Sequence, residues 1–349
     1  IIIAAVFTIW TYYQSDKATG ENFAPGPYQW QWQKAMAWVR DNTPLTAVFA
    51  HWWDYGYWVQ SIGERATIVD GGNTLGYWNH LMGRYVLTIT GEKESMEFLY
   101  AHNATHLLID STEIGKYTAF SSIGSNGEYD RMSWIPEIMM DERQTIEKDN
   151  ETIYIYATGS ATDEDIIWKE NDKEILLPRR NSYIIGIILS QQSGKNISQP
   201  AGVFMYNNQQ YRIPLRYAYI REKLIDFNSG LNAGVFIYPK LESSSAGIKS
   251  NEIGAGFYLS KRTIRSSIAQ LYLFGQNHSY FKIAHVESNG VVADLKNNGF
   301  YQGEFLYYQG FQGPIKIWDI KYPSDIKLNK EYLSANYPKE FQTTDSSQY

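Results

Sequence analysis

The feature that most constrains this chain is the run Trp52-Trp53-Asp54-Tyr55-Gly56, which sets two of its 11 tryptophans side by side before a carboxylate. Each indole N–H can only donate a hydrogen bond, and an ionised Asp can only accept. A hydroxyl does both, so Trp52, Trp53 and Asp54 together match one Ser or Thr side chain. Neighbouring side chains diverge on a strand and on a helix. The run is therefore expected to turn, with Tyr55 and Gly56 shaping the bend because glycine tolerates unusual backbone angles.

Two other interpretations of the tryptophan pair stay open. Aromatic side chains dominate protein cores, so the run would be a core patch in a structural cell-surface domain. Alternatively, Trp52 and Trp53 would form a flat platform for sugar rings in a membrane-anchored carbohydrate- or peptide-binding module without catalytic activity. Exposure separates the three interpretations: partly exposed in a polar turn for hydroxyl recognition, flat and open for a platform, and fully buried for a core patch.

Composition excludes several classes of function. The 349 residues are 44% hydrophobic, enough for a large core, and the net charge of −6 argues against a nucleic-acid partner. Without cysteine there is neither a disulfide nor a thiolate metal site. His102 and His106 lack a nearby acid, and Asp163-Glu164-Asp165 is expected to be a solvated loop. With no standard catalytic motif either, we expect no catalytic residue and no metal site in this chain.

The start of the chain indicates a membrane. Residues 1–13 are almost wholly apolar and end in the aromatic residues Trp10, Tyr12 and Tyr13. Polar residues follow from position 14, as in the aromatic belt where a membrane helix enters water. We interpret 1–16 as the end of a transmembrane helix and 17–27, rich in Gly and Pro, as a linker. Weak support for an extracytoplasmic location comes from the Asn-X-Ser/Thr sequons at Asn103, Asn150, Asn196 and Asn277.

The remaining pattern predicts an α+β fold, in which a mixed α/β core carries the tryptophan run and β-rich parts are inserted or peripheral. The core is expected over 28–150, a β-rich domain over 151–255, a return to the core over 256–340 and a tail over 341–349. Hydrophobic periodicity places the main core elements as follows: helices at 28–42, 77–89, 92–102, 114–122 and 262–274, and strands at 45–50, 66–69, 105–110, 281–286 and 315–320.

Two segments carry a family resemblance. The run Trp52–Gly56, followed by Thr67-Ile68-Val69-Asp70-Gly71-Gly72-Asn73, is similar to the signature of the oligosaccharyltransferase catalytic subunits, namely archaeal AglB, bacterial PglB and their eukaryotic counterpart. The segment Leu107–Phe120 resembles the part of archaeal members that holds the second family motif, Asp-x-x-Lys-x-x-x-Met/Ile. Resemblance covers most of 28–125 and 255–290.

The second motif is only partly matched. Lys116 fits the pattern, while Glu113 stands where Asp is expected and Phe120 where Met or Ile is expected. The resemblance implies that Lys116 supports the site near the acceptor.

For function, the resemblance implies an enzyme that transfers a lipid-linked, dolichol-type oligosaccharide to the Asn of Asn-X-Ser/Thr sequons. Trp52, Trp53 and Asp54 would bind the Ser/Thr hydroxyl of the acceptor polypeptide. The family's divalent metal, Mn or Mg, and its lipid-carrier surface belong to a membrane part outside this chain. The chain itself would be an acceptor-recognition domain on the extracytoplasmic face of the cell membrane, inactive alone.

Overall fold

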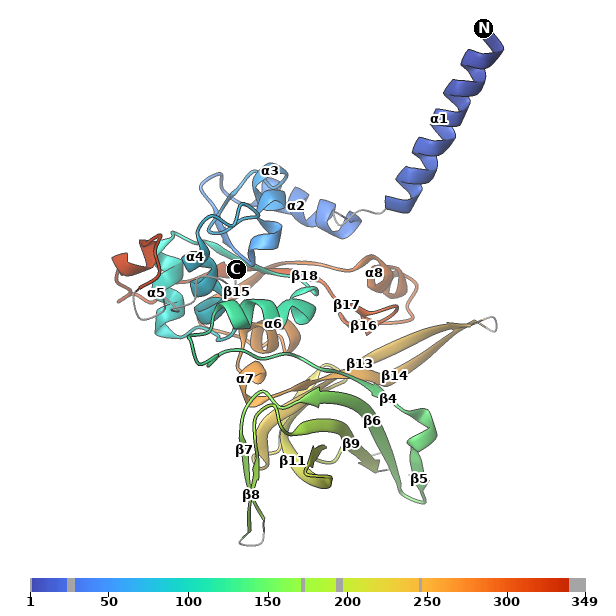
Figure 1. The fold of residues 1–349 in the computed structure, drawn as a ribbon, viewed down its shortest axis with the longest axis vertical. Helices are drawn as coiled ribbons and strands as arrows, with labels where there is room; N and C mark the ends of the chain where they lie inside the picture. The colour runs from blue at the N-terminus through green and yellow to red at the C-terminus, as the bar shows by residue number, and fades with distance from the viewer. Residues whose placement is uncertain (1, 24–28, 171–172, 193–196, 245–246, 339–349) are drawn as a thin grey trace.

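A computed structural model describes residues 2–23, 29–170, 173–192, 197–244 and 247–338. Two parts are visible, an upper part of helices around a small sheet and a lower part made of one strongly curled sheet (Figure 1). The tail expected at 341–349 and the sequon residue Asn196 lie outside the described residues. The mixture of helices and strands confirms the predicted α+β class.

The upper part is built on a five-stranded sheet in the order β15-β18-β3-β1-β2. Its strands are β1 (Val48–Ala50), β2 (Ala66–Thr67), β3 (His106–Ile109), β15 (Phe281–Glu287) and β18 (Ile315–Ile320). β1 runs parallel to both β2 and β3, while β18 pairs antiparallel with β3. The chain therefore leaves β1 at the sheet edge where parallel α/β units usually carry their functional loops.

Helical segments surround this sheet. They are α2 (Trp30–Asn42), α3 (Gly56–Ser61), α4 (Gly76–Leu81), the π-helical η2 (Met82–Leu87), α5 (Lys93–Ala101), α6 (Glu113–Ile123), α7 (Lys261–Ile264), the π-helical η4 (Ile268–Leu273), α8 (Gly290–Asn297) and the short 3-10 segments η1 (Trp53–Tyr55) and η5 (Lys330–Leu333). Their apolar faces and the sheet share one hydrophobic core, which includes Trp52 and Tyr55. The 3-10 segment η3 (Glu142–Gln144) belongs to the lower part instead.

The lower part is a single large sheet that closes on itself, because β11 pairs with both β10 and β13. Its strands are β4 (Glu137–Met140), β5 (Ile146–Lys148), β6 (Glu151–Ala161), β9 (Tyr183–Gln192), β10 (Ala201–Tyr206), β11 (Gln209–Ile220), β12 (Lys223–Asp226), β13 (Leu231–Ser244), β14 (Gly247–Leu259), β16 (Leu306–Tyr307) and β17 (Phe311–Gln312), with a separate hairpin of β7 (Ile166–Glu170) and β8 (Lys173–Leu177). A second hydrophobic core fills it.

Most predicted core elements are present, with differences at their ends. The helix predicted over 262–274 is interrupted between α7 and η4, and the helix predicted over 77–89 changes from α4 to η2. The large sheet starts at β4, before the expected boundary at 151, and ends after 255. β16 and β17 join that sheet rather than the core, because β16 pairs with β13.

The N-terminal helix α1 (Ile2–Phe23) stands away from the rest of the chain, with its large apolar side chains exposed (Figure 1). A linker was expected at 17–27, but α1 continues to Phe23, so this prediction is wrong for residues 17–23. Gly20 was expected to interrupt the helix, yet a glycine inside a helix costs only ~1 kcal/mol. Residues 24–28 are outside the described part. Among the described helices, none is both long and apolar enough to cross a membrane.

Two glycines allow α6 and η2 to pack with their backbones in contact. A Cβ on Gly83 would lie 2.3 Å from the carbonyl oxygen of Phe120, and a Cβ on Gly124 would lie 2.5 Å from the amide nitrogen of Arg84. We therefore expect Gly83→Ala to lower the free energy of unfolding by ~1–3 kcal/mol, measured by urea denaturation.

The matched control for this prediction is Gly127→Ala, because a Cβ there meets no atom within 4 Å. It should change the free energy of unfolding by less than ~0.5 kcal/mol. Equal effects of the two substitutions would contradict the packing explanation.

Candidate functional site

The tryptophan run turns as predicted, directly after β1. Trp52 is still extended, Trp53–Tyr55 form one 3-10 turn and α3 begins at Gly56. The predicted reason for Gly56 is wrong, since its φ of −54° and ψ of −46° are ordinary helical angles. Glycine is needed for space instead, because a Cβ there would lie 2.4 Å from the Cα of Asp70.

The two tryptophans differ in exposure. Trp52 is only 2% exposed and packs edge-on against Phe120, with ring centroids 5.8 Å apart. Trp53 and Asp54 are partly exposed. Partial exposure is therefore confirmed for Trp53 and wrong for Trp52, whose burial matches the core interpretation. A flat platform does not form, because Trp52 is covered and its ring is inclined by 51° to that of Trp53.

The polar groups of the turn remain available to a ligand. The indole N–H groups of Trp52 and Trp53 donate to no other described residue, and neither nitrogen is among the fully buried atoms that lack a partner. The Asp54 carboxylate forms an ion pair through Oδ2 only, which leaves Oδ1 without a partner in the described part of the chain. Two donors and one acceptor are thus free in three consecutive residues.

Lys116 lies beside this turn, although it is far away in the sequence. α6 brings its ammonium group into an ion pair with Asp54. The same group donates to the Tyr55 hydroxyl over 3.1 Å and lies 4.7 Å from the centre of the Tyr55 ring. The two sequence motifs therefore meet, and Lys116 fixes the Asp54 carboxylate from one side.

Behind Lys116 lies a buried polar cluster centred on the Tyr55 hydroxyl. This hydroxyl donates to Asp110 over 3.0 Å, is hydrogen-bonded to Thr112 and lies 3.4 Å from Glu113 Oε2. Glu113 Oε2 also accepts from the backbone N–H of Asp110 over 2.9 Å. Tyr55 thus joins the turn to the start of α6.

Glu113 and Phe120 lie behind the turn rather than at its surface. Both side chains are fully buried, and Phe120 packs between Trp52 and Tyr117. Burial, followed by the nearby Asp110 carboxylate, raises the pKa of Glu113 well above its usual value. Burial therefore favours the protonated form of the Glu113 carboxyl.

Sequence reasoning missed two residues that hold the turn. His51 is fully buried and its Nδ1 donates to the carbonyl oxygen of Trp52 over 2.7 Å. Burial lowers the pKa of His51 to about 4, so the ring is neutral. Trp32, from α2, stacks on the Tyr55 ring at 4.8 Å. In the sequence, only the position of His51 directly before Trp52 indicated a contact with the turn, and nothing indicated that Trp32 lies there.

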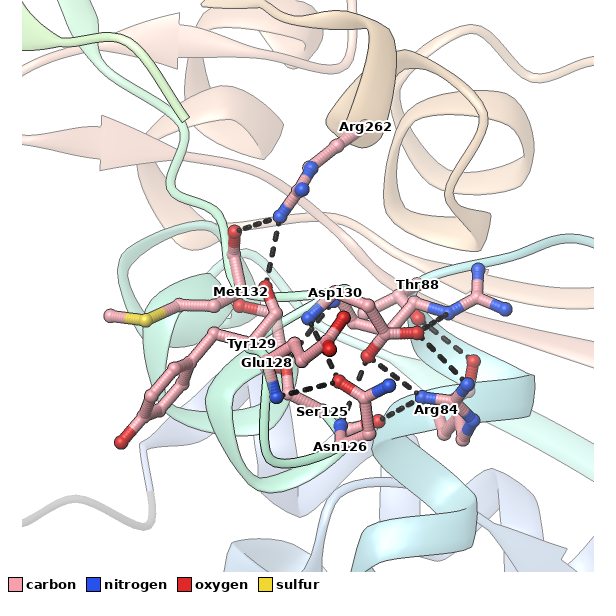
Figure 2. Close-up of polar contacts among 12 residues, drawn as sticks. Arg84, Thr88, Ser125, Asn126, Glu128, Tyr129, Asp130, Met132 and Arg262 are labelled. Carbon is pink, nitrogen blue, oxygen red and sulfur yellow. Dashed lines mark hydrogen bonds and ion pairs between the residues drawn. The ribbon is translucent and has the colours of Figure 1, made fainter. Parts of the chain in front are cut away.

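The C-terminal end of α6 is followed by a loop that is held by a bidentate ion pair between Arg84 and Asp130. Figure 2 shows Arg84 facing Asp130, with nitrogen to oxygen distances of 3.0 and 2.9 Å. Within this loop, the Asn126 side-chain oxygen accepts a hydrogen bond from the backbone N–H of Glu128. Arg262 donates to the carbonyl oxygen of Met132. With both ends held, α6 presents Lys116 at a fixed position.

Other candidates from the sequence serve the structure. His106 contacts Asp319 at 3.3 Å, and His102 packs against Trp78. The expectation of a solvated loop is wrong for Asp163, which is buried and accepts from Ser133 and Ser260 hydroxyls over 2.5 Å each. Across the described ranges no three His, Asp or Glu side chains are grouped to hold a metal, so no chemical step here is assigned to one.

The raised pKa of Glu113 gives a test by pH. Its raised pKa means that the folded state keeps a proton that the unfolded chain releases above its ordinary pKa of 4.5. The stability that Glu113 contributes is complete below that pH and falls by about 1.4 kcal/mol per unit as pH rises towards the raised pKa. Glu113→Gln removes this loss.

We therefore expect the difference in free energy of unfolding, Glu113→Gln minus wild type, to increase between about pH 5 and about pH 8. Urea denaturation of both proteins at each pH measures this difference. Glu128→Gln, in an exposed loop, is the control and should show no such trend. A difference between Glu113→Gln and wild type that does not change with pH would show that the buried carboxyl is ionised.

Comparison with known proteins shows what the segment that holds this site is similar to. Residues 46–163 match the family model described as the STT3/PglB/AglB core domain. Over 95 residues, the chain is 30% identical to dolichyl-phosphooligosaccharide-protein glycotransferase 1 of Pyrococcus furiosus, covering 27% of this chain and 10% of the relative. It is 34% identical over 95 residues to the glycosyltransferase subunit STT3B of Oryza sativa subsp. japonica, covering 26% and 12% of the two chains.

Among solved structures, the C-terminal domain of C. jejuni PglB is 11% identical, with a TM-score of 0.42 over 83% of this chain and 99% of that one. The matches with the curated relatives span only about a tenth of their lengths. The matched core domain begins just before the Trp52–Gly56 turn and includes all of α6. Residues 46–163 of this chain, which hold the turn and α6, are therefore similar to the STT3/PglB/AglB core domain.

Proposed function

We propose that this chain recognises the acceptor polypeptide in protein N-glycosylation, by binding the Ser or Thr hydroxyl of an Asn-X-Ser/Thr sequon at Trp52, Trp53 and Asp54. The observation that carries the proposal is the set of free groups in this turn, namely two indole N–H donors and Asp54 Oδ1. A hydroxyl can satisfy all three at once, since it accepts two hydrogen bonds and donates one.

Fixed geometry supports the choice of a hydroxyl over a larger polar group. Trp52 is held by Phe120 from behind, and Asp54 is held by Lys116, which is itself bonded to the buried Tyr55 hydroxyl. Groups that are fixed before binding lose little entropy on binding. A site of this kind rejects an analogue without the hydroxyl, because its polar groups then remain unpaired.

The transfer reaction itself is proposed for a larger protein. There, a lipid-linked, dolichol-type oligosaccharide would be transferred to the sequon Asn at a divalent metal, Mn or Mg, whose ligands lie outside this chain. We propose that the present chain alone has no transferase activity. We also propose that α1, with its exposed apolar side chains, attaches the domain to the extracytoplasmic face of the cell membrane.

A non-catalytic carbohydrate-binding module is the alternative. It needs an open pair of rings, and burial of Trp52 removes half of that platform. A purely structural role of the run agrees with the burial of Trp52, yet it gives no reason for a partly exposed Trp53 and an Asp54 carboxylate oxygen without a partner. The hydroxyl-binding proposal accounts for both tryptophans.

Replacement of Trp53 by Phe tests the proposal, because it removes the indole donor and keeps an aromatic ring. We expect a peptide with an Asn-X-Thr sequon to bind wild type about tenfold more tightly than its Asn-X-Val counterpart, in NMR titrations that follow indole N–H signals. In Trp53→Phe that preference should fall by roughly three- to fivefold, the loss of one neutral hydrogen bond.

Trp30→Phe is the matched control, because Trp30 lies on α2 with 65% of its surface exposed. It should keep the full preference for Thr over Val. Wild-type protein that binds the Thr and Val peptides equally well would refute hydroxyl recognition by this turn.

A further inference from the structure

A cavity of about 230 Å³ lies directly beside the tryptophan turn. Its wall includes residues 67–70, which follow β2, and residues 73–75 with Trp78 and Asn79 at the start of α4. Asp70 belongs to this wall and is also the residue against which Gly56 packs without room for a Cβ. The cavity and the turn therefore share one piece of backbone.

One acceptor in the cavity wall is left unsatisfied. Asn79 is 4% exposed, and its Nδ2 donates to Oδ1 of Asn73. Its own Oδ1 is buried and has no hydrogen-bond partner. Buried polar atoms are nearly always paired in folded proteins, so the unpaired Oδ1 of Asn79 is an exception next to the cavity.

The same wall carries a negative charge without a cation. Asp70 Oδ1 accepts from the backbone N–H of Gly72 over 2.8 Å, and Oδ2 accepts from Gln60 Nε2 over 2.9 Å. Both donors are neutral, and within the described ranges no Lys or Arg forms an ion pair with Asp70. No cationic residue lines the cavity. A ligand with donors only and a positive charge complements this wall.

The remaining wall suits a long side chain. Ile68, Leu75 and Trp78 provide apolar surface, and the Trp78 indole is fixed by a 2.9 Å hydrogen bond to the carbonyl oxygen of Ser334. Lys and Arg lay their aliphatic stems along such surfaces and keep the charged end at polar groups. The volume equals roughly eight water molecules at ~30 Å³ each, which is room for one such side chain.

We propose that this cavity binds the side chain of a Lys or Arg that flanks the sequon in the acceptor polypeptide. The inference rests on the proposed function, since it requires the sequon to bind at the neighbouring turn. An extended peptide advances ~3.3–3.6 Å per residue. With Gly56 packed on Asp70, a peptide held at Asp54 reaches the cavity within a few residues.

The test uses this chain and a set of peptides with one Asn-X-Thr sequon and Lys, Ala or Glu at successive flanking positions. NMR titration should find one position at which Lys binds about tenfold more tightly than Glu, the effect of a charge-assisted hydrogen bond. Asp70→Asn should reduce this preference to less than about twofold. Asp41→Asn, which removes an exposed negative charge on α2, should leave the preference intact.

A second variant covers the case in which Asp70→Asn disturbs the turn. Thr74 is exposed and lines the cavity, so Thr74→Arg places a guanidinium in the cavity without a change to the core. It should abolish the Lys preference and keep the preference for Thr over Val in the sequon.

The outcomes separate the two proposals. Equal binding of the Lys and Glu peptides to wild type, with the Thr preference present, would overturn the cavity proposal and leave hydroxyl recognition standing. A Lys preference that persists in both Asp70→Asn and Thr74→Arg would overturn it as well. Loss of the Thr preference in wild type would refute the proposed function, and the cavity proposal with it.

Discussion

The ion pair between Lys116 and Asp54 is the contact on which the arrangement of the site depends. It joins the turn after β1 to the first turns of α6, although Asp54 and Lys116 are 62 positions apart in the sequence. The Lys116 ammonium group also donates a hydrogen bond to the buried Tyr55 hydroxyl. An isolated surface ion pair contributes little to stability. Here the ammonium group also donates to a buried hydroxyl, so the pair fixes a direction for the carboxylate rather than adding much free energy.

Close backbone packing completes the frame around this contact. Gly56 packs on Asp70, and Gly83 and Gly124 let η2 and α6 approach each other. The Phe120 ring then supports Trp52 from within the core. Flexible ligand-binding loops usually lose entropy on binding. In this chain the turn is instead an extension of the core, with its polar atoms at the surface.

The sequence was sufficient to predict most helices and strands of the core, and the family resemblance indicated that Lys116 lies near the tryptophan turn. The sequence was not sufficient to predict which contacts require the individual residues of the turn. Short apolar runs were sufficient for β1 and β3, and an N-cap-like segment at Ser111-Thr112-Glu113 was sufficient for α6, because these signals are local in the sequence. The role of Gly56 was misassigned, since its backbone is ordinary and only the neighbouring Asp70 explains the glycine.

Burial could not be predicted in the same way. Trp52 and Asp163 are covered by residues distant in sequence, Phe120 in one case and Ser133 and Ser260 in the other. Nothing local distinguishes a covered tryptophan from its exposed neighbour. The unpaired Oδ1 of Asn79 also cannot be predicted from the sequence, because it depends on which residues surround it in the fold.

The most direct test of hydroxyl recognition is a double-mutant cycle between Asp54→Asn in the protein and Thr→Val in the sequon of a bound peptide. The four binding free energies give the coupling between the carboxylate and the hydroxyl, free of the separate effect of each change. If Asp54 accepts from the hydroxyl, the coupling should be about 1.5–3 kcal/mol. A coupling of zero within error would show that Asp54 does not contact the hydroxyl and would contradict the account.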